Sequence, residues 1–121
     1  MLDHRKVAAG LSISGVFELA PLRDSPHVND KVNLTESEIE TLSPMRRQGV
    51  NKPLSIAYGT GELPAMIASS RDYHAYRARA HLPGDLIPVV NTNHFTILDE
   101  LRHPDIVLAR AVLRMVEYRV L

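Results

Sequence analysis

Apolar residues follow two different patterns along this chain. Short apolar runs bounded by glycine, proline or asparagine are typical of buried strands. Runs of this kind predict strands at Leu11–Phe17, Pro53–Tyr58 and Leu86–Val90. Longer stretches with apolar residues at helical spacing predict one helix over 63–80 and another that begins at Pro104 and reaches about residue 120.

The last of these predicted helices has two distinct faces. An apolar stripe would pack on a core, and a charged face would be solvated. The stripe consists of Leu108, Ala111, Val112 and Met115, and the charged face of Arg110, Arg114 and Glu117.

The stretch between the first two strands is less regular. Residues 19–33 contain two prolines and little periodicity, which predicts a long loop. Thr35 followed by Glu38 fits a capping box, in which each side chain bonds the other residue's backbone amide. The helix that this box opens should be short, because Ser43-Pro44 ends it.

Strands that alternate with helices indicate an α/β fold with a parallel sheet. In such sheets ligands bind beyond the carboxyl ends of the strands. Glu62 follows the second predicted strand and His94 the third. The sequence therefore places a carboxylate and an imidazole at the same rim.

Composition removes several classes of function. The chain has 121 residues, 45% of them apolar, with 14 basic and 14 acidic residues and no cysteine. Zero formal charge argues against a nucleic-acid or anionic-membrane surface, and the missing thiols exclude disulfides and cysteine nucleophiles. No apolar run approaches a membrane span or a signal peptide, so a cytoplasmic protein is expected and the sequon at Asn33 carries no meaning.

Four stretches together resemble the α/β-hydrolases of the arylformamidase (kynurenine formamidase) and esterase branch. They occur in the expected order: "SGVFELAPL" from Ser14, "LSP" from Leu42, "AYGTGELP" from Ala57 and "NHFTILDEL" from Asn93. The resemblance covers the C-terminal half of that fold. It implies that residues 1–121 form a single partial domain with about three parallel strands and flanking helices.

The resemblance also implies roles for the two rim residues. His94 matches the catalytic histidine, which takes the proton of the nucleophile and passes it to the leaving group. Glu62 occupies the acid position, where aspartate is commoner. Asp72 lies too far inside a helix to replace it, and Asp99 belongs to the turn after His94. Such enzymes hydrolyse an aryl formamide such as N-formylkynurenine, in tryptophan catabolism, or a small ester, and they need no metal or organic cofactor.

The nucleophile of that family is not found in this sequence. Its serine occupies a G-x-S-x-G elbow between a strand and a helix. The nearest stretch, Gly10 to Gly15, contains Ser12 and Ser14, but its second glycine is out of register and it falls within a predicted strand. The HGG-type oxyanion loop is missing as well. The resemblance thus implies a triad whose serine lies outside these residues.

The remaining histidines and two tyrosines have simpler explanations. His74 and His81 are seven residues apart and could share a helix face, but two histidines without a third ligand make a poor metal site. Tyr73 and Tyr76 are expected to pack in the core. Three other histidines are expected at the surface or at caps: His4, His27 and His103.

Three functions stay open at this stage. The chain could be part of a serine hydrolase acting on a small amide or ester, a non-catalytic hydrolase half that serves as a folding partner, or an unrelated α/β binding module. In the first two cases the strand at Leu11–Phe17 would be an unpaired edge. We therefore expect a homodimer or capture by a complementary N-terminal chain.

Overall fold

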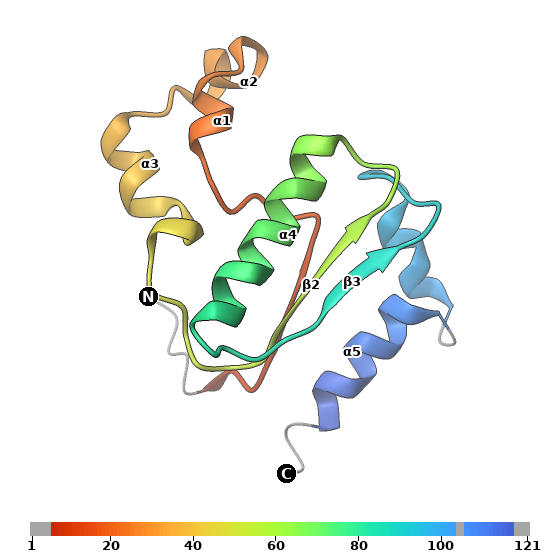
Figure 1. Ribbon diagram of the computed structural model, residues 1–121. Coiled ribbons are helices and arrows are strands. Elements are labelled where there is room, and N and C mark those ends of the chain that lie inside the picture. The colour runs from red at the N-terminus through yellow and green to blue at the C-terminus, as the bar shows by residue number, and fades with distance from the viewer. Residues whose placement is uncertain (1–5, 104–105, 118–121) are drawn as a thin grey trace.

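The computed structural model describes residues 6–103 and 106–117, except for the side chains of residues 27 and 28 (Figure 1). The elements in chain order are β1 (Gly10–Ile13), α1 (Ala20–Arg23), α2 (Pro26–Val32), α3 (Glu36–Leu42), a 3-10 helix (Pro44–Arg46), β2 (Leu54–Gly59), α4 (Pro64–Arg79), β3 (Leu86–Val89), a second 3-10 helix (Ile97–Arg102) and α5 (Val107–Glu117).

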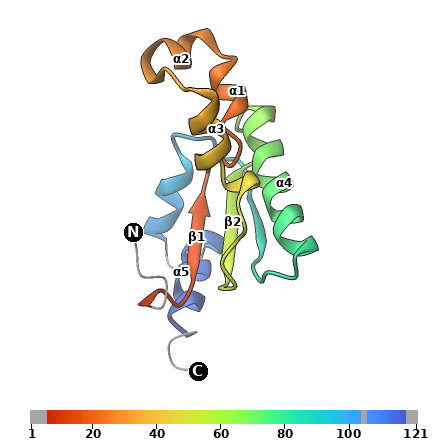
Figure 2. The same cartoon turned by 90° about the vertical axis from the view of Figure 1, so that its left-hand side faces the viewer.

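The three strands form one parallel sheet in the order β1-β2-β3. Ser12 is paired in register with Ile56, and Ala57 with Ile87. Helices α4 and α5 lie on opposite faces of this sheet (Figures 1 and 2). This arrangement confirms the predicted α/β fold class, with about three parallel strands and flanking helices.

The central strand β2 supplies the core on both faces, because successive side chains of a strand point to opposite sides. Ile56 packs with Tyr73 on the α4 face, and Ala57 packs with Leu108 on the α5 face. Ile56, Ala57 and Leu108 are fully buried. A parallel strand covered on both faces requires a continuous apolar run, which is why β2 was recognisable in the sequence.

Aromatic stacking reinforces the α4 face. The rings of Phe17 and Tyr73 stack with centroids 4.3 Å apart, and Tyr76 follows Tyr73 at 6.1 Å. The Tyr76 hydroxyl donates a hydrogen bond to the backbone oxygen of Arg47 (2.8 Å). The packing role predicted for the two tyrosines is thereby confirmed.

Residues 18–47 leave the sheet and return beside their starting point. The Met45 amide donates to the Phe17 oxygen (2.9 Å), and the Leu19 amide donates to Ser43 Oγ (3.0 Å). Helices α1, α2 and α3 lie beyond the carboxyl end of β1 (Figure 2). We call residues 18–47 the excursion.

The prediction of a long loop over residues 19–33 was wrong, because helices α1 and α2 lie within this stretch. Pro21 is the second residue of α1, and Pro26 is the first residue of α2. Proline is compatible with the first turn, where its missing N–H has no intrahelical partner in any case. The capping box that opens α3 is confirmed, with Thr35 and Glu38 bonding each other's amides.

The first strand is shorter than predicted. It ends at Ile13 rather than Phe17, because Ser14 adopts a left-handed conformation (φ 54°) that no strand continues through. Phe17 is buried through its stack on α4 and not through a place in the sheet. The predicted bounds of β2 and β3 differ from the observed ones by one residue.

The C-terminal helix begins at Val107, later than predicted, while Pro104 and the predicted end beyond Glu117 lie outside the described residues. Leu108 and Ala111 of its apolar stripe are buried, but Val112 is exposed. The buried Ala109 takes part in the packing instead. The 3-10 helix at residues 97–102 was not predicted.

Within the described ranges, no helix is long and apolar enough to cross a membrane.

Candidate active site

Glu62 is held by the turn that ends β2. Its Oε2 accepts a hydrogen bond from the Gly59 amide (2.7 Å), while its own amide donates to the Gly59 oxygen (3.1 Å). The side chain is completely buried. Glu62 directly precedes Leu63, the N-cap of α4. A buried carboxylate requires such partners, because an unpaired one would be costly to desolvate.

The turn after β2 is in close contact with the loop after β3. The Gly61 amide donates to the Thr92 oxygen (2.8 Å), and the Asn91 amide donates to Thr60 Oγ1 (3.2 Å). A Cβ on Gly59 would lie 2.5 Å from the Thr92 oxygen. Two glycines in "YGTGE" thus allow the backbones to approach, and this contact fixes the distance between the acid and the histidine.

Local hydrogen bonds order the loop that contains His94. Asn91 turns the chain with a left-handed conformation (φ 59°), and Thr92 Oγ1 donates to the Val89 oxygen (2.9 Å). The side-chain oxygen of Asn93 then accepts from the amides of Phe95 (2.8 Å) and Thr96 (3.0 Å). Asparagine suits this role because it caps backbone amides through an Asx turn. His94 is therefore placed by hydrogen bonds on both sides of it.

His94 and Glu62 meet across these two loops. His94 Nδ1 lies 3.2 Å from Glu62 Oε1. The Glu62 side chain is 0% exposed, whereas the His94 side chain is 52% exposed. The predicted proximity of the two residues is confirmed. An imidazole bonded through Nδ1 to an ionised carboxylate carries its proton there and has a free lone pair on Nε2.

The rival carboxylates lie elsewhere. Asp72 is exposed on α4, as its helical position predicted. Asp99 lies in the 3-10 helix after His94, where it faces Arg102 at 3.7 Å. Neither forms a hydrogen bond or ion pair with His94 among the described residues.

The two serines of the first strand do not form an elbow. Ser12 lies within β1, and Ser14 follows it directly. The chain continues without a helix to Ala20, whereas a nucleophile elbow leads straight into one. Ser14 Oγ is buried and has no hydrogen-bond partner among the described residues. No described contact joins either serine to His94.

Among the described residues, the other histidines do not form a second site. His74 lies on α4 with Nε2 3.1 Å from the Gly84 oxygen, and His81 lies beyond the end of that helix with a left-handed backbone. The expectation that they share one helix is therefore wrong. His103 is exposed, His4 lies outside the described residues, and the side chain of His27 is not described. Across the described part of the chain, no three metal-ligating side chains are grouped.

The sequence singled out the two rim side chains but not the residues that hold them. Gly59 lies against Thr92 of the other loop, where an added Cβ would lie 2.5 Å from the Thr92 oxygen. Thr92 offered no distinguishing signal, because a threonine after a strand is common. The glycine pair in "YGTGE" was the available signal, since closely spaced glycines mark places where backbones approach.

No family model matches this sequence. The chain is 24% identical over 117 residues to a kynurenine formamidase of Danio rerio, covering 92% of this chain and 40% of the relative. It is 26% identical over 117 residues to a kynurenine formamidase of Salmo salar, with 91% and 40% covered. The chain spans about two fifths of the length of these curated relatives. The predicted resemblance is therefore confirmed: nearly the whole chain is similar to one part of the kynurenine formamidases.

Proposed function

We propose that His94 and Glu62 are the base and the acid of a serine hydrolase that cleaves an aryl formamide or a small ester. The nucleophile and the oxyanion hole would come from a segment outside residues 1–121. The observation that carries this proposal is the contact between half-exposed His94 Nδ1 and fully buried Glu62 Oε1.

Each group has a distinct task in the proposed reaction. Glu62 holds the Nδ1–H tautomer and stabilises the imidazolium once it forms. Nε2 of His94 removes the hydroxyl proton of the serine as that oxygen attacks the carbonyl carbon. The same Nε2 then donates this proton to the departing amine or alcohol, and water repeats the cycle to release formate or another acid.

The substrate class is supported by similarity and by one local feature. The relatives are named kynurenine formamidases, which favours an N-formylkynurenine-like amide and a place in tryptophan catabolism. Phe95 is 88% exposed, and its ring meets the His94 ring edge-on with centroids 5.7 Å apart. An exposed aromatic face beside the base could contact the aryl group of such a substrate.

The tautomer can be tested on the 121-residue chain alone. Side-chain ¹⁵N NMR should show neutral His94 with its proton on Nδ1, and Glu62→Gln should shift this population while leaving exposed His103 unchanged. A His94 ring protonated only on Nε2 when neutral would contradict the proposed pairing.

The activity test requires a completed protein. The chain should be co-expressed with the part of the Danio rerio protein that lies outside the matched region, and hydrolysis of N-formylkynurenine measured. His94→Ala should reduce kcat by about 10³-fold or more, and Glu62→Gln by a smaller factor. His103→Ala is the matched control. Full activity in His94→Ala would refute the assignment.

A second candidate function is that the chain acts as a non-catalytic half that binds a partner. The feature that favours it is β1, whose other edge pairs with no strand among the described residues. An open edge presents unpaired amides and carbonyls and recruits another strand. We propose either a homodimer with two β1 strands antiparallel across a two-fold axis or a complementary N-terminal chain.

Light scattering at micromolar concentration tests this association. A dimer that Ile13→Pro converts to monomer would support pairing through β1, because proline removes a ladder donor. Exposed Val32→Pro on α2 is unsuitable as a control, since it would break that helix. Leu42→Lys, an exposed change away from β1, should leave the dimer intact. A stable wild-type monomer would count against the homodimer.

A further inference from the structure

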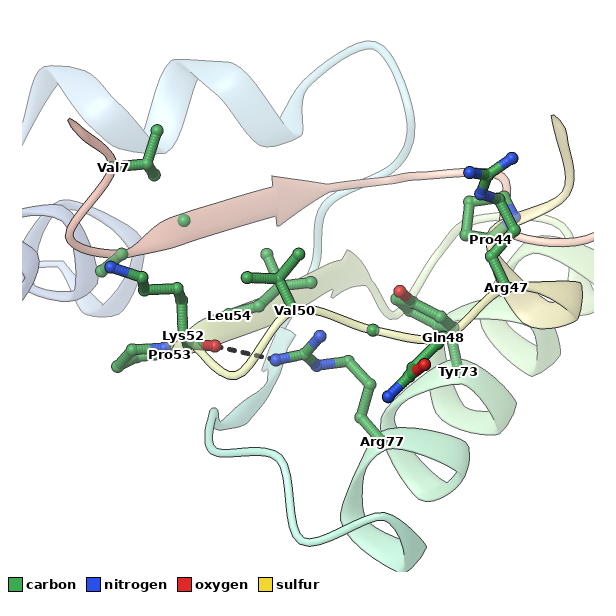
Figure 3. Close-up of a pocket in the computed structure, with 13 residues that line it drawn as sticks. Val7, Pro44, Arg47, Gln48, Val50, Lys52, Pro53, Leu54, Tyr73 and Arg77 are labelled. Atoms are coloured by element: carbon green, nitrogen blue, oxygen red, sulfur yellow. Dashed lines mark hydrogen bonds between the residues drawn. The ribbon is translucent and has the colours of Figure 1, made fainter. Parts of the chain in front are cut away.

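A hollow of about 410 Å³ opens at the amino end of the sheet, at the opposite end from His94. It is bounded by the chain before β1, by residues 47–54 and by α4 (Figure 3). Its volume lies within the range of small-molecule sites. Because His94 and Glu62 follow the carboxyl ends of β3 and β2, this hollow is separate from the candidate active site.

The lining combines apolar surface with positive charge only. Arg47, Lys52 and Arg77 line the hollow, and no aspartate or glutamate among the described residues does. Figure 3 shows the Arg77 guanidinium beside the backbone of Lys52, with the charged ends of Lys52 and Arg47 farther away. Arg47 Nη1 donates to the Thr41 oxygen (2.6 Å). The apolar part of the wall includes Val7, Ala9, Val50, Leu54 and Tyr73.

Arg77 is the central feature, because it is only 4% exposed and forms no ion pair within the described ranges. Both of its hydrogen bonds leave from Nη2, to the backbone oxygens of Lys52 (2.9 Å) and Pro83 (3.3 Å). These neutral acceptors anchor the guanidinium but do not balance its charge. A buried charge without a counter-charge is unusual and favours a bound anion.

The rest of the guanidinium faces the hollow. Nη1 and Nε have no hydrogen-bond partner among the described residues, and neither is fully enclosed. A Cβ on Gly49 would lie 3.1 Å from Nη1, so this nitrogen lies against the backbone of a residue that lines the wall. The donor is therefore held in place by Nη2 while Nη1 stays available to a ligand.

We propose that this hollow binds a small apolar carboxylate. Its carboxylate would accept a hydrogen bond from Arg77 Nη1, with additional attraction from Lys52, and its hydrocarbon or aromatic body would contact Val50, Leu54 and Tyr73. A charge-assisted bond from a preplaced guanidinium gives orientation as well as affinity. The proposal does not depend on the proposed hydrolase activity.

The probe is 2-naphthoate, with neutral 2-naphthamide as its control, titrated into the 121-residue chain and followed by ¹H–¹⁵N NMR and calorimetry. We expect saturable binding of the carboxylate and at least about 10-fold weaker binding of the amide. The amides of Gly10 and Gly49 should shift, whereas those of Gly59 and Gly61 beside the candidate active site should not.

Three variants of the lining and one control variant separate binding from folding. Arg77→Met should lower affinity by about 10-fold or more. Since this change also removes the two backbone contacts, Val50→Asp provides a second test: it places a carboxylate at an exposed loop position of the wall and should block the probe in a folded protein. Lys52→Gln should weaken binding by about 2- to 5-fold, and Lys31→Gln on α2, which does not line the hollow, should not.

Any of three results with the unmodified chain would overturn the proposal. These are no saturable binding of 2-naphthoate, equal binding of the amide, and chemical-shift changes centred on Gly59 and Gly61. Undiminished binding by folded Val50→Asp would overturn it as well.

Discussion

The sheet with its two helices and the excursion are stabilised by different physical forces. In the sheet, side chains such as Ile56 and Leu108 are fully buried between layers. In the excursion, most side chains are exposed, and ion pairs such as Arg46 with Glu18 (2.6 Å) and Glu40 (2.7 Å) lie at the surface. Buried apolar area contributes far more than exposed ion pairs.

This difference explains where the candidate active site is placed. Glu62 and His94 follow β2 and β3, so their positions depend on the well-packed sheet and on the contact between two short loops. The excursion approaches the same end of the sheet but closes on itself through Phe17 and Met45. We therefore expect the excursion to open locally while the acid and histidine stay in register.

The largest expected effect tests the dominance of the sheet. Ile56→Ala removes a fully buried side chain of β2 and should lower the free energy of unfolding by about 2–5 kcal/mol. Leu42→Ala at the end of α3, where the side chain is 57% exposed, should change it by less than about 0.5 kcal/mol. Urea denaturation measures both, and equal losses would abolish the distinction between the regions.

The next effect concerns the contact between the site loops. Gly59→Ala would place a Cβ 2.5 Å from the Thr92 oxygen, and should destabilise the protein by about 1–3 kcal/mol while separating His94 from Glu62. Gly61→Ala, with the corresponding distance at 3.0 Å, should have a smaller effect. Thermal denaturation and the His94 ring ¹⁵N shifts report the two consequences. An unchanged His94 signal in Gly59→Ala would show that this contact does not position the pair.

A smaller effect is expected in the excursion. Thr35→Ala removes the side chain that accepts from the Glu38 amide (3.1 Å), and should cost about 1 kcal/mol. Hydrogen exchange should show faster opening of α3 with no change in β2. Faster exchange throughout the sheet would mean that the excursion and the sheet unfold as one unit.

The smallest effect is a pH dependence that arises in the excursion. A hydrogen bond from Arg46 lowers the pKa of Glu18 below its usual 4.5. Because the folded-state pKa is the lower one, this contribution is present above pH 4.5 and is lost as the pH falls through the folded-state value. Between about pH 6 and about pH 3, the free energy of unfolding should therefore fall slightly less steeply with decreasing pH in Glu18→Gln than in wild type. Urea denaturation at each pH measures this free energy. The same pH dependence of the unfolding free energy in both proteins would contradict the predicted contribution of Glu18.

The local signals in the sequence were strong where one interaction dominates. The apolar run of β2, the capping box at Thr35 and the amphipathic helix α5 were all recognisable, because strand burial, caps and helical periodicity act over a few residues. The prediction failed where a local signal had two meanings. Pro21 and Pro26 break a helix interior but suit a first turn, and only the structure distinguishes these positions.

For the site, the sequence by itself determined the two side chains and their shared rim, since parallel strands bring their carboxyl ends together. Only the tertiary structure decided that Glu62 is fully buried and lies 3.2 Å from His94 Nδ1. That distance depends on the approach of Gly59 to Thr92, a contact between residues 33 positions apart in the sequence. The burial of Arg77, which forms no ion pair with any described residue, was likewise invisible beforehand, because burial of a helix residue depends on which segments pack against it.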